Sequence, residues 1–367
     1  MENLNSNQIT LSWLNSVNRV SNKIIEKLLE YFSYDTKSLW DNFEEEKSNI
    51  TFLKPEIITK LSNCKINYEE NLYRKLKESN SHILTIYDND YPIKLKQISG
   101  APYIIYYKGS LKNINNLSIA IVGSRKATSY GKWATEKFTK ELSELGVNII
   151  SGLAVGIDTI AHKTSIKYNA KTFGIIGSGI DIIYPKSNEK LYSDIENSGG
   201  AVITEYSFNM PPMPTNFHYR NRIISGLSDG VLVIEAQEKS GTLITASHAA
   251  NQGKEIFAVP GNIDSLYSKG TNLLIKDGAK ITTSINDIIE EILEFKELMH
   301  KKHNNIDYTT LTKEELSIIN LLKSGAKTTY DLTSYLSQNI GSILSSLTML
   351  EMKGIISKTS GDKFILN

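Results

Sequence analysis

The sequence predicts an α/β protein built around a doubly wound parallel sheet, with a helical domain before the sheet and a winged-helix domain after it. Three patterns indicate this fold. Apolar residues recur at helical spacing in residues 1–80, short apolar segments alternate with amphipathic ones in residues 81–300, and a helix, turn, helix, turn, helix and hairpin pattern fills residues 311–367. Residues 301–310 are predicted to be a linker.

The central domain carries the signal for the sheet. An aromatic strand is expected at 103–107, and seven further strands are expected at 117–125, 147–152, 172–179, 200–206, 230–236, 255–261 and 278–282. Most of these segments are apolar on both faces, and amphipathic helices separate several of them. Strands of this kind lie in a parallel sheet that helices cover on both sides.

The N-terminal domain is predicted to be a small helical accessory domain of the SAM-like kind. The segment "NKIIEKLLEYF" places five apolar residues on one helical face: Ile24, Ile25, Leu28, Leu29 and Phe32. Acids outnumber bases by 12 to 11 in residues 1–80, so the domain does not attract DNA by its charge. The turn "VNRVSN" also lacks the glycine with which a helix-hairpin-helix module binds phosphate.

The C-terminal domain has a winged-helix pattern without the charge of a DNA reader. Residues 307–367 hold six lysines and six acids, and the presumed recognition helix "NIGSILSSLTMLEMKG" has no base before Lys353. A major-groove reader needs Arg, Lys, Asn or Gln on that helix. A role in protein interaction or regulation, or weak DNA contact, is therefore favoured over specific readout. Its inward-facing residues are expected to be Ile340, Ile343, Leu344, Leu347 and Leu350.

Composition excludes several classes of protein. The net charge is +1, no apolar run approaches the roughly 20 residues that span a bilayer, and the N-terminus does not resemble a signal peptide. The single cysteine, Cys64, excludes an internal disulfide framework, and the histidines show no metal-ligand spacing. We expect a cytoplasmic protein without membrane contact or metal.

Small, glycine-rich turns follow four of the predicted strands. In an open parallel sheet the carboxyl ends of the strands line the ligand crevice, where glycines admit a ligand and helix N-termini attract anions. A nucleotide or a nucleic-acid backbone would suit this edge. The Gly-x-Gly-x-x-Gly spacing of NAD sites is absent, so no cofactor is expected. The turns are Gly123-Ser124-Arg125, Ser151-Gly152, Gly177-Ser178-Gly179 and Ser240-Gly241-Thr242.

Two of the chain's five arginines lie in the run "NFHYRNR". Arg220 and Arg222 follow Phe217 and Tyr219, and no acidic residue occurs between positions 207 and 228. Rings beside arginines on a loop are typical of single-stranded nucleic-acid binding, since rings stack on bases and charge contacts the backbone. We expect the segment "SFNMPPMPTNF", residues 207–217, to be an ordered, non-regular loop, and the arginines beside its ring to converge with Arg125. In the alternative, the rings cap the core and the arginines pair with distant acids such as Glu205 and Glu235.

Catalysis has little support in the sequence. Asp158 and His162 lie four residues apart on one helix, so they share a face. A catalytic dyad is possible, but a helix cap with a core-facing histidine is favoured. No nucleophile, base and orienting residue occur at a convincing spacing, so an enzyme is not expected.

Taken together, the motifs resemble the DNA-processing protein A family (DprA/Smf). The resemblance rests on "IVGSR", "SGLAVGIDTIAH", "GSGIDIIYP", "RNRIISGLS", "VIEAQEKSGTLITA" and "VPGN" followed by "GTNLLIKDGA". It implies a bacterial, cytoplasmic, dimeric protein with an extended Rossmann-like domain that binds single-stranded DNA. It also implies that the protein protects incoming DNA during natural transformation and loads the RecA recombinase, with no established enzymatic activity.

The resemblance also implies roles for individual residues. Arg125, Arg220 and Arg222 would contact DNA phosphates, Phe217 would face a base, and Lys186 would be a further basic contact. The DNA site predicted from these residues, the glycine-rich turns and Asn221 comprises Gly123, Ser124, Arg125, Ser151, Gly152, Gly177, Gly179, Lys186, Phe217, Arg220, Asn221, Arg222, Ser240, Gly241 and Thr242.

One departure from the family pattern and two rival functions remain, and the first rival is a purely regulatory adaptor that acts through the winged helix. The family commonly has Phe-Pro where this chain has Phe217-His218, and we hypothesise that the missing proline makes the loop more mobile. The second rival is a nucleotide-processing enzyme of the lysine-decarboxylase-like phosphoribohydrolase group. That group carries a Pro-Gly-Gly-x-Gly-Thr run before a glutamate, whereas this chain has only "KSGTLITA".

Overall fold

The computed structural model describes residues 4–296, 311–353, 355–359 and 362–366. The chain divides into two compact units, Met1–Ile292 and Leu293–Asn367. Each unit has a core of its own and is described by itself. Every helix in the described ranges is too short or too polar to cross a bilayer.

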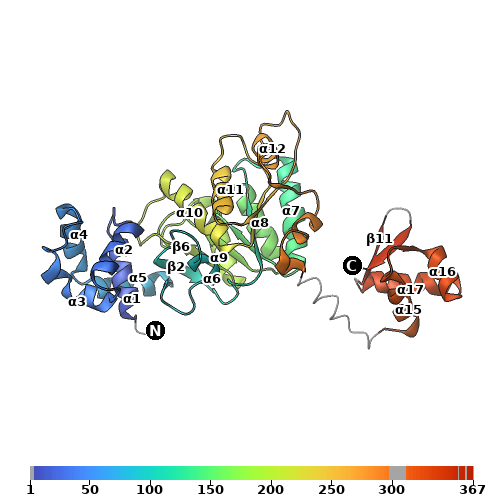
Figure 1. Cartoon of the computed structure of the whole chain (residues 1–367), viewed down its shortest axis with the longest axis horizontal. Coiled ribbons are helices and arrows are strands. Elements are labelled where there is room, and N and C mark those ends of the chain that lie inside the picture. The colour runs from blue at the N-terminus through green and yellow to red at the C-terminus, as the bar shows by residue number, and fades with distance from the viewer. Residues whose placement is uncertain (1–3, 297–310, 354, 360–361, 367) are drawn as a thin grey trace. The chain divides into compact units, whose positions relative to one another are not determined.

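A nine-stranded, mostly parallel sheet forms the centre of the first unit (Figure 1). Its order is β1-β2-β6-β5-β4-β3-β7-β8-β9; the strands from β6 to β9 are parallel, and β1 and β2 join antiparallel. All eight predicted strands form, and β1 is a ninth that was not predicted. The bounds are β1 His82–Thr85, β2 Ile104–Gly109, β3 Ser118–Val122, β4 Asn148–Ser151, β5 Thr172–Ile175, β6 Ala201–Thr204, β7 Gly230–Val233, β8 Glu255–Ala258 and β9 Lys280–Ile281.

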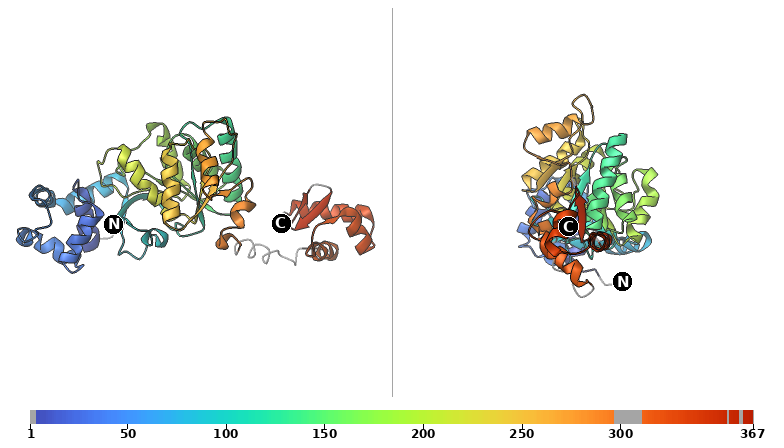
Figure 2. Two further views of the ribbon diagram at one scale, coloured as in Figure 1. Left: turned by 45° about the horizontal axis from the view of Figure 1, so that its top comes forward. Right: turned by 90° about the vertical axis from the view of Figure 1, so that its right-hand side faces the viewer.

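Helices cover both faces of this sheet, as expected for buried parallel strands. In the right-hand view of Figure 2 the green helices lie on one side of the sheet and the gold to orange helices on the other. Alternate residues of a strand therefore enter different cores: Ile104 and Tyr106 pack on one face, and Ile105 packs on the other. The helices are α6 Ile93–Lys96, α7 Ser129–Glu144, α8 Ile157–Lys167, α9 Glu189–Asn197, α10 Pro214–Leu227, α11 Gly241–Asn251, α12 Lys269–Lys276 and α13 Asn286–Ile289, with a 3-10 turn, η1, at Lys186–Asn188.

Five helices precede the sheet and share a core with one of its faces. They are α1 Ser6–Ser16, α2 Asn22–Tyr31, α3 Thr36–Glu46, α4 Pro55–Lys65 and α5 Tyr68–Ser79. Trp13 is fully buried, and its indole nitrogen donates to the carbonyl of Leu61 at 3.0 Å. Because this core continues into Tyr106 of β2, these helices belong to the same compact unit as the sheet.

The second unit is small; three helices and three strands lie among its described residues after position 310, and residues 293–296 are also helical. The strands form a sheet in the order β10-β12-β11. Of the residues expected to face inward on α17, Ile343, Leu347 and Leu350 are buried, but Ile340 and Leu344 are 56% and 47% exposed. The expected stripe was too wide, because only positions i, i+4 and i+7 share one face. The bounds are α15 Lys313–Leu322, β10 Lys327–Thr328, α16 Thr329–Leu336, α17 Ile340–Met352, β11 Ile356–Thr359 and β12 Lys363–Leu366; the predicted linker, 301–310, lies outside the described residues.

Candidate nucleic-acid interface

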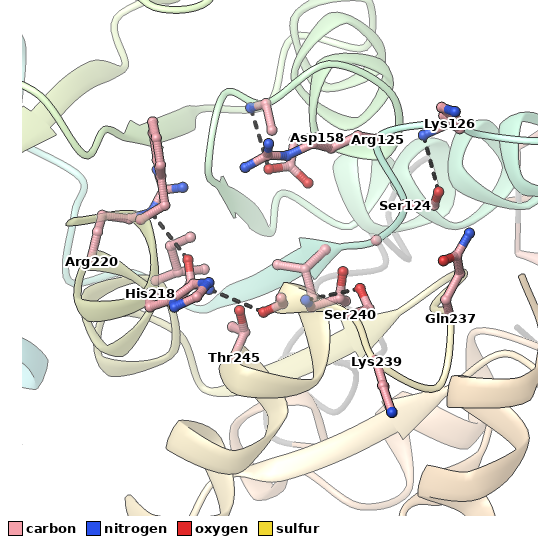
Figure 3. Close-up of a pocket in the computed structure, with 18 of the residues that line it drawn as sticks. Ser124, Arg125, Lys126, Asp158, His218, Arg220, Gln237, Lys239, Ser240 and Thr245 are labelled. Atoms are coloured by element: carbon pink, nitrogen blue, oxygen red, sulfur yellow. Dashed lines mark hydrogen bonds between the residues drawn. The ribbon is translucent and has the colours of Figure 1, made fainter. Parts of the chain in front are cut away.

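A pocket of about 490 Å³ opens at the carboxyl ends of β3 and β7 (Figure 3). β3 pairs with β4 on one side and with β7 on the other, and the strand order reverses at this point. The loops that follow β3 and β7 therefore separate and leave a crevice, which is where open α/β sheets bind ligands. The polar and aromatic lining comprises Ser124, Arg125, Lys126, Asp158, Phe217, His218, Arg220, Asn221, Gln237, Lys239, Ser240, Thr242, Thr245 and Tyr267, with Gly123 and Gly241 between them.

The pocket gathers two of the four predicted turns completely. Gly123-Ser124-Arg125 and Ser240-Gly241-Thr242 both line it. Gly152 borders a smaller adjoining pocket beneath Arg220 and Phe217. The remaining predicted residues lie outside the lining of both pockets, and they are Ser151, Gly177, Gly179, Lys186 and Arg222.

Most of these glycines make room for neighbouring protein atoms. A Cβ at Gly177 would lie 2.8 Å from the Phe217 ring, and one at Gly152 would lie 2.9 Å from an amino group of Arg220. These glycines let the ring and the guanidinium settle against the strand ends. Only at Gly241, within this set, does the Cβ direction open into space, so this glycine alone is not needed to make room for other protein atoms.

The run "NFHYRNR" lies on helix α10, so the prediction of a loop is wrong from Pro214 onward, whereas residues 207–213 lie outside helices and strands as predicted. α10 begins at Pro214, and the prolines at 211 and 212 lie just before it. A proline is well suited to the first helical position, because its missing N–H has no partner there and its φ already fits. The prolines thus precede a helix instead of marking a loop, and the hypothesis of a mobile loop at His218 loses its premise.

Because α10 is a helix, it directs the side chains of Arg220 and Arg222 to different sides, although the sequence analysis assigned both arginines to one DNA site. Two residues correspond to about 200° of rotation around an α-helix, so Arg220 and Arg222 point in nearly opposite directions. Arg222 forms two hydrogen bonds with Glu205, at 3.0 and 2.6 Å, and its side chain is 5% exposed. Burial opposes the charge of Arg222, but the Glu205 carboxylate outweighs that effect and raises the pKa of Arg222.

Arg220 is held beside the pocket without an acidic partner. Its Nη1 donates to the carbonyl of Gly152 at 2.9 Å and to the carbonyl of Ile175, and its Nε donates to the Asn221 side chain at 3.2 Å. In the described ranges no carboxylate oxygen lies within 4.0 Å of its guanidinium. Burial lowers the pKa of Arg220 to about 10, so the side chain stays charged at neutral pH. A buried cation of this kind attracts an anion into the pocket.

Phe217 lies between the two guanidiniums of the site. The carbon centres of the Arg125 and Arg220 guanidiniums are 5.7 and 5.8 Å from the centre of the Phe217 ring. The Tyr184 ring packs against it at 5.5 Å between centroids. Arg125 is exposed and Arg220 is buried, so the Phe217 ring has one cation near it at the surface and another in the interior.

Asp158 and His162 have structural partners. The Asp158 carboxylate accepts from the backbone N–H groups of Gly152 and Ala154 at 3.1 and 3.4 Å, and burial raises its pKa to about 6 despite the nearby Arg220. Asp158 closes the loop before α8, whereas the helix cap itself is Gly156. His162 is fully buried against Thr172 at 2.7 Å, and burial, followed by the charge of Arg220, lowers its pKa to about 3. This agrees with the interpretation of His162 as a core histidine.

One acid near the pocket, Glu235, and two lysines in its lining, Lys126 and Lys239, have not yet been described. The Glu235 carboxylate accepts from the backbone N–H and the hydroxyl of Thr128, at the start of α7, and therefore does not pair with an arginine. Lys126 and Lys239 line the pocket and are exposed, but sequence reasoning missed them. Their positions could have indicated a role in the site, because Lys126 follows Arg125 and Lys239 immediately precedes the Ser240 turn. In a lysine-rich chain, however, a single lysine is weak evidence for a binding site.

Comparison with known proteins decides the family. The model of the DNA recombination-mediator protein A family matches residues 82–293, which include every residue of the pocket. This chain belongs to that family. Protein Smf of Escherichia coli is 39% identical over 217 residues, which are 59% of this chain and 58% of that protein. The DNA processing protein DprA of Bacillus subtilis is 39% identical over 251 residues, 66% of this chain and 81% of that protein.

Solved structures of the family have the same fold. DNA processing protein A from Streptococcus pneumoniae aligns with a TM-score of 0.66 at 32% identity, covering 79% of this chain and 99% of that one. The protein from Helicobacter pylori, whose structure was described for its single-stranded DNA binding mode, aligns with a TM-score of 0.53 at 30% identity. That alignment covers 60% of this chain and 96% of the Helicobacter pylori chain.

Proposed function

We propose that this protein binds single-stranded DNA in the pocket after β3 and β7 and acts as a recombination mediator. The observation that carries the proposal is Arg220, a buried guanidinium held by backbone carbonyls and without a carboxylate partner in the described ranges. A phosphate would supply the missing negative charge and accept from the free side of the guanidinium. Arg125, Lys126 and Lys239 add exposed cations around the same pocket.

The ring of Phe217 favours a single strand over a duplex. Every base has a face that can stack on an aromatic ring, but the bases of a duplex are already stacked on one another. A pocket of about 490 Å³ has room for parts of one strand and not for a double helix. The described binding mode of the Helicobacter pylori relative supports the same ligand class.

The roles assigned to single residues follow the geometry. Arg125 and Arg220 contact phosphates, and Phe217 stacks on a base. Arg222 does not line the pocket and is given a structural role through Glu205. Lys186 lies outside the pocket lining but is exposed on η1, just after Tyr184, which contacts Phe217; we propose it as a contact for strand that leaves the pocket.

The wider role rests on the family. We propose that the protein is cytoplasmic, forms a homodimer, protects DNA taken up during natural transformation and transfers it to the RecA recombinase, without catalysing a reaction itself. We also assign the second unit to the winged-helix class, because the expected three helices and a hairpin, β11–β12, occur there, with an additional short strand, β10, that completes a three-stranded sheet. Incubation with AMP should release no free base, which would separate this proposal from a phosphoribohydrolase.

The proposal is tested by measuring the affinity of the full chain for oligo-dT and for a duplex at several salt concentrations. Oligo-dT should bind more tightly, with an affinity that falls steeply as salt rises. Arg125→Ala should weaken binding and reduce the slope of log K against log salt by about 0.7, the value expected for one lost phosphate contact of a single strand.

Arg19→Ala is the matched control, because Arg19 is an exposed arginine of the same unit that pairs with Glu56 at 3.6 Å, away from the pocket. Its affinity and salt slope should equal those of the wild type. Equal affinity for oligo-dT and duplex, or an oligo-dT affinity that does not respond to salt, would show that the proposed function is wrong.

A further inference from the structure

Two exposed aromatic rings lie side by side on α7, outside the pocket. Trp133 is 57% exposed and Tyr130 is 42% exposed. Their ring centroids are 5.9 Å apart and their planes differ by 30°. The hydroxyl of Tyr130 donates to the carbonyl of Pro260 at 2.8 Å, which holds that ring in place. The other two tryptophans, Trp13 and Trp40, pack into the N-terminal core, so Trp133 is the exception.

Lysines lie before and after this ring pair along the chain. The ammonium of Lys137 is 5.7 Å from the centre of the Trp133 ring. On the other side of the ring pair along the chain, Lys126 lines the pocket, and α7 begins three residues after it. The rings therefore follow directly on the cations of the proposed DNA site, one helical turn into α7.

The length of this surface suits a few nucleotides. From the start of α7 to Lys137 the helix rises about 12 Å, at 1.5 Å per residue. Stacked bases are spaced by about 3.4 Å, so about three of them fit along this stretch. Aromatic rings interleaved with basic side chains are the usual surface on which proteins bind single strands without sequence preference.

We propose that Tyr130 and Trp133 form a second stacking station, on which single-stranded DNA continues after it leaves the pocket. This inference rests on the proposed function, and it extends the binding surface from the strand ends to α7. Charge complementarity selects the occupant: the Lys137 ammonium lies beside the Trp133 ring and Lys126 lines the pocket three residues before α7, so cations precede and follow the rings and favour a polyanionic strand. Exposed Lys132 and Glu136 interrupt the apolar surface, which disfavours a lipid or an apolar protein helix.

The test uses the fluorescence of the three tryptophans in the full chain. Oligo-dT of about 20 nucleotides, long enough to leave the pocket, is titrated into wild type and into Trp133→Phe, while the anisotropy of a labelled oligonucleotide reports binding independently. The wild type should show quenching that saturates together with binding. Trp133→Phe should bind similarly, because phenylalanine still stacks, but it should lose that quenching.

Affinity provides the second readout. Trp133→Ala should lower the affinity for the long oligo-dT by about 5-fold or more, the effect of one lost base stack, and leave a short one of about 4 nucleotides unaffected. Tyr168→Ala is the matched control. The Tyr168 ring also has two lysines, Lys140 and Lys167, at 5.6 and 5.5 Å, but it lies at the far end of α8 from the strand ends. Its affinities should not change.

Tight binding without a change in Trp133 fluorescence would overturn the stacking station and leave the proposed function intact. A Trp133 signal that depends on protein concentration in the absence of DNA would also overturn it, by assigning the rings to a second copy of the chain. Failure of the wild type to bind oligo-dT at all would instead remove both proposals.

Discussion

Arg220 and Arg222 show how two neighbouring arginines of one helix can take different tasks. Arg220 donates hydrogen bonds only to backbone carbonyls and an amide and lies against the Phe217 ring; the charge of Asp158 acts on it from beyond ion-pair distance, so no carboxylate is bonded to the guanidinium. Arg222 forms an ion pair with Glu205, and the carbon centre of its guanidinium lies 4.0 Å from the centre of the Tyr219 ring. The pair between Arg222 and Glu205 fixes the rotation of α10, and this rotation turns Arg220 and Phe217 toward the pocket.

The first prediction concerns Arg222→Met. It should lower the free energy of unfolding by about 3–5 kcal/mol, because the Glu205 carboxylate is then buried without a partner. The double variant Arg222→Met with Glu205→Leu should recover most of that loss. Urea unfolding measures both effects, and the salt slope of oligo-dT binding should stay at the wild-type value in the folded variant.

The matched control is Arg125→Met, at an exposed position that lines the pocket. We expect the reverse result there, with unchanged unfolding and a reduced salt slope. If Arg222→Met were as stable as Arg125→Met and lost one phosphate contact, Arg222 would be a DNA ligand after all.

Among the elements, those with a strong local pattern could be predicted from the sequence. The parallel strands are apolar on both faces, and β3, β4, β5, β6 and β7 are buried at every position. The start of α10 could not be predicted, because a run of prolines is equally compatible with a loop. With α10 taken as a loop, the side on which Arg222 lies could not be inferred either.

The predicted site was right where it followed from topology. Parallel strands bring their carboxyl ends to one edge, so the turns after β3 and β7 meet even though more than 100 residues separate Arg125 from Ser240. It failed where a glycine serves internal packing. Nothing local distinguishes Gly177, which makes room for Phe217, from Gly241, which opens to the pocket. Only the tertiary contacts separate these two uses.

The loop between β4 and α8 provides the second prediction, which concerns pH. Burial raises the pKa of Asp158 from 3.8 to about 6, so the folded protein binds more protons than the unfolded chain between these values. This group therefore makes the protein less stable as pH rises from 4 to 6, by about 3 kcal/mol at 1.36 kcal/mol per pKa unit. Relative to Asp158→Asn, the wild type should gain stability as pH falls from 7 to 4.

Urea unfolding followed by tryptophan fluorescence checks this, because all three tryptophans lie in the first unit. Asp287→Asn is the control of opposite sign. The N–H of Thr283 lowers the pKa of Asp287, so that carboxylate stabilises the fold above its unfolded pKa and loses the effect as pH falls. A stability difference between Asp158→Asn and wild type that stays constant from pH 7 to 4 would contradict the buried, titrating carboxylate.

At the scale of the whole molecule, the pocket belongs entirely to one of the two units. Its lining residues fall between Val122 and Tyr267, within the unit Met1–Ile292 and within the family match to residues 82–293. The second unit offers a different surface. Its helix α17 exposes Ile340, Leu344 and Met352 and carries no basic residue. The pocket and this helix, which has Glu351 but no basic residue, therefore belong to separate compact units.

The last prediction follows from this separation. A protein that ends at residue 300 keeps the whole first unit, Met1–Ile292, and should bind oligo-dT within about twofold of the full chain and with the same salt slope. The slope is the decisive quantity, because it counts the phosphates neutralised, whereas affinity alone would also change with a second copy of the chain. A shallower slope in the shortened protein would mean that lysines of the second unit contact the strand. An unchanged slope would leave the exposed face of α17 available for a partner other than DNA.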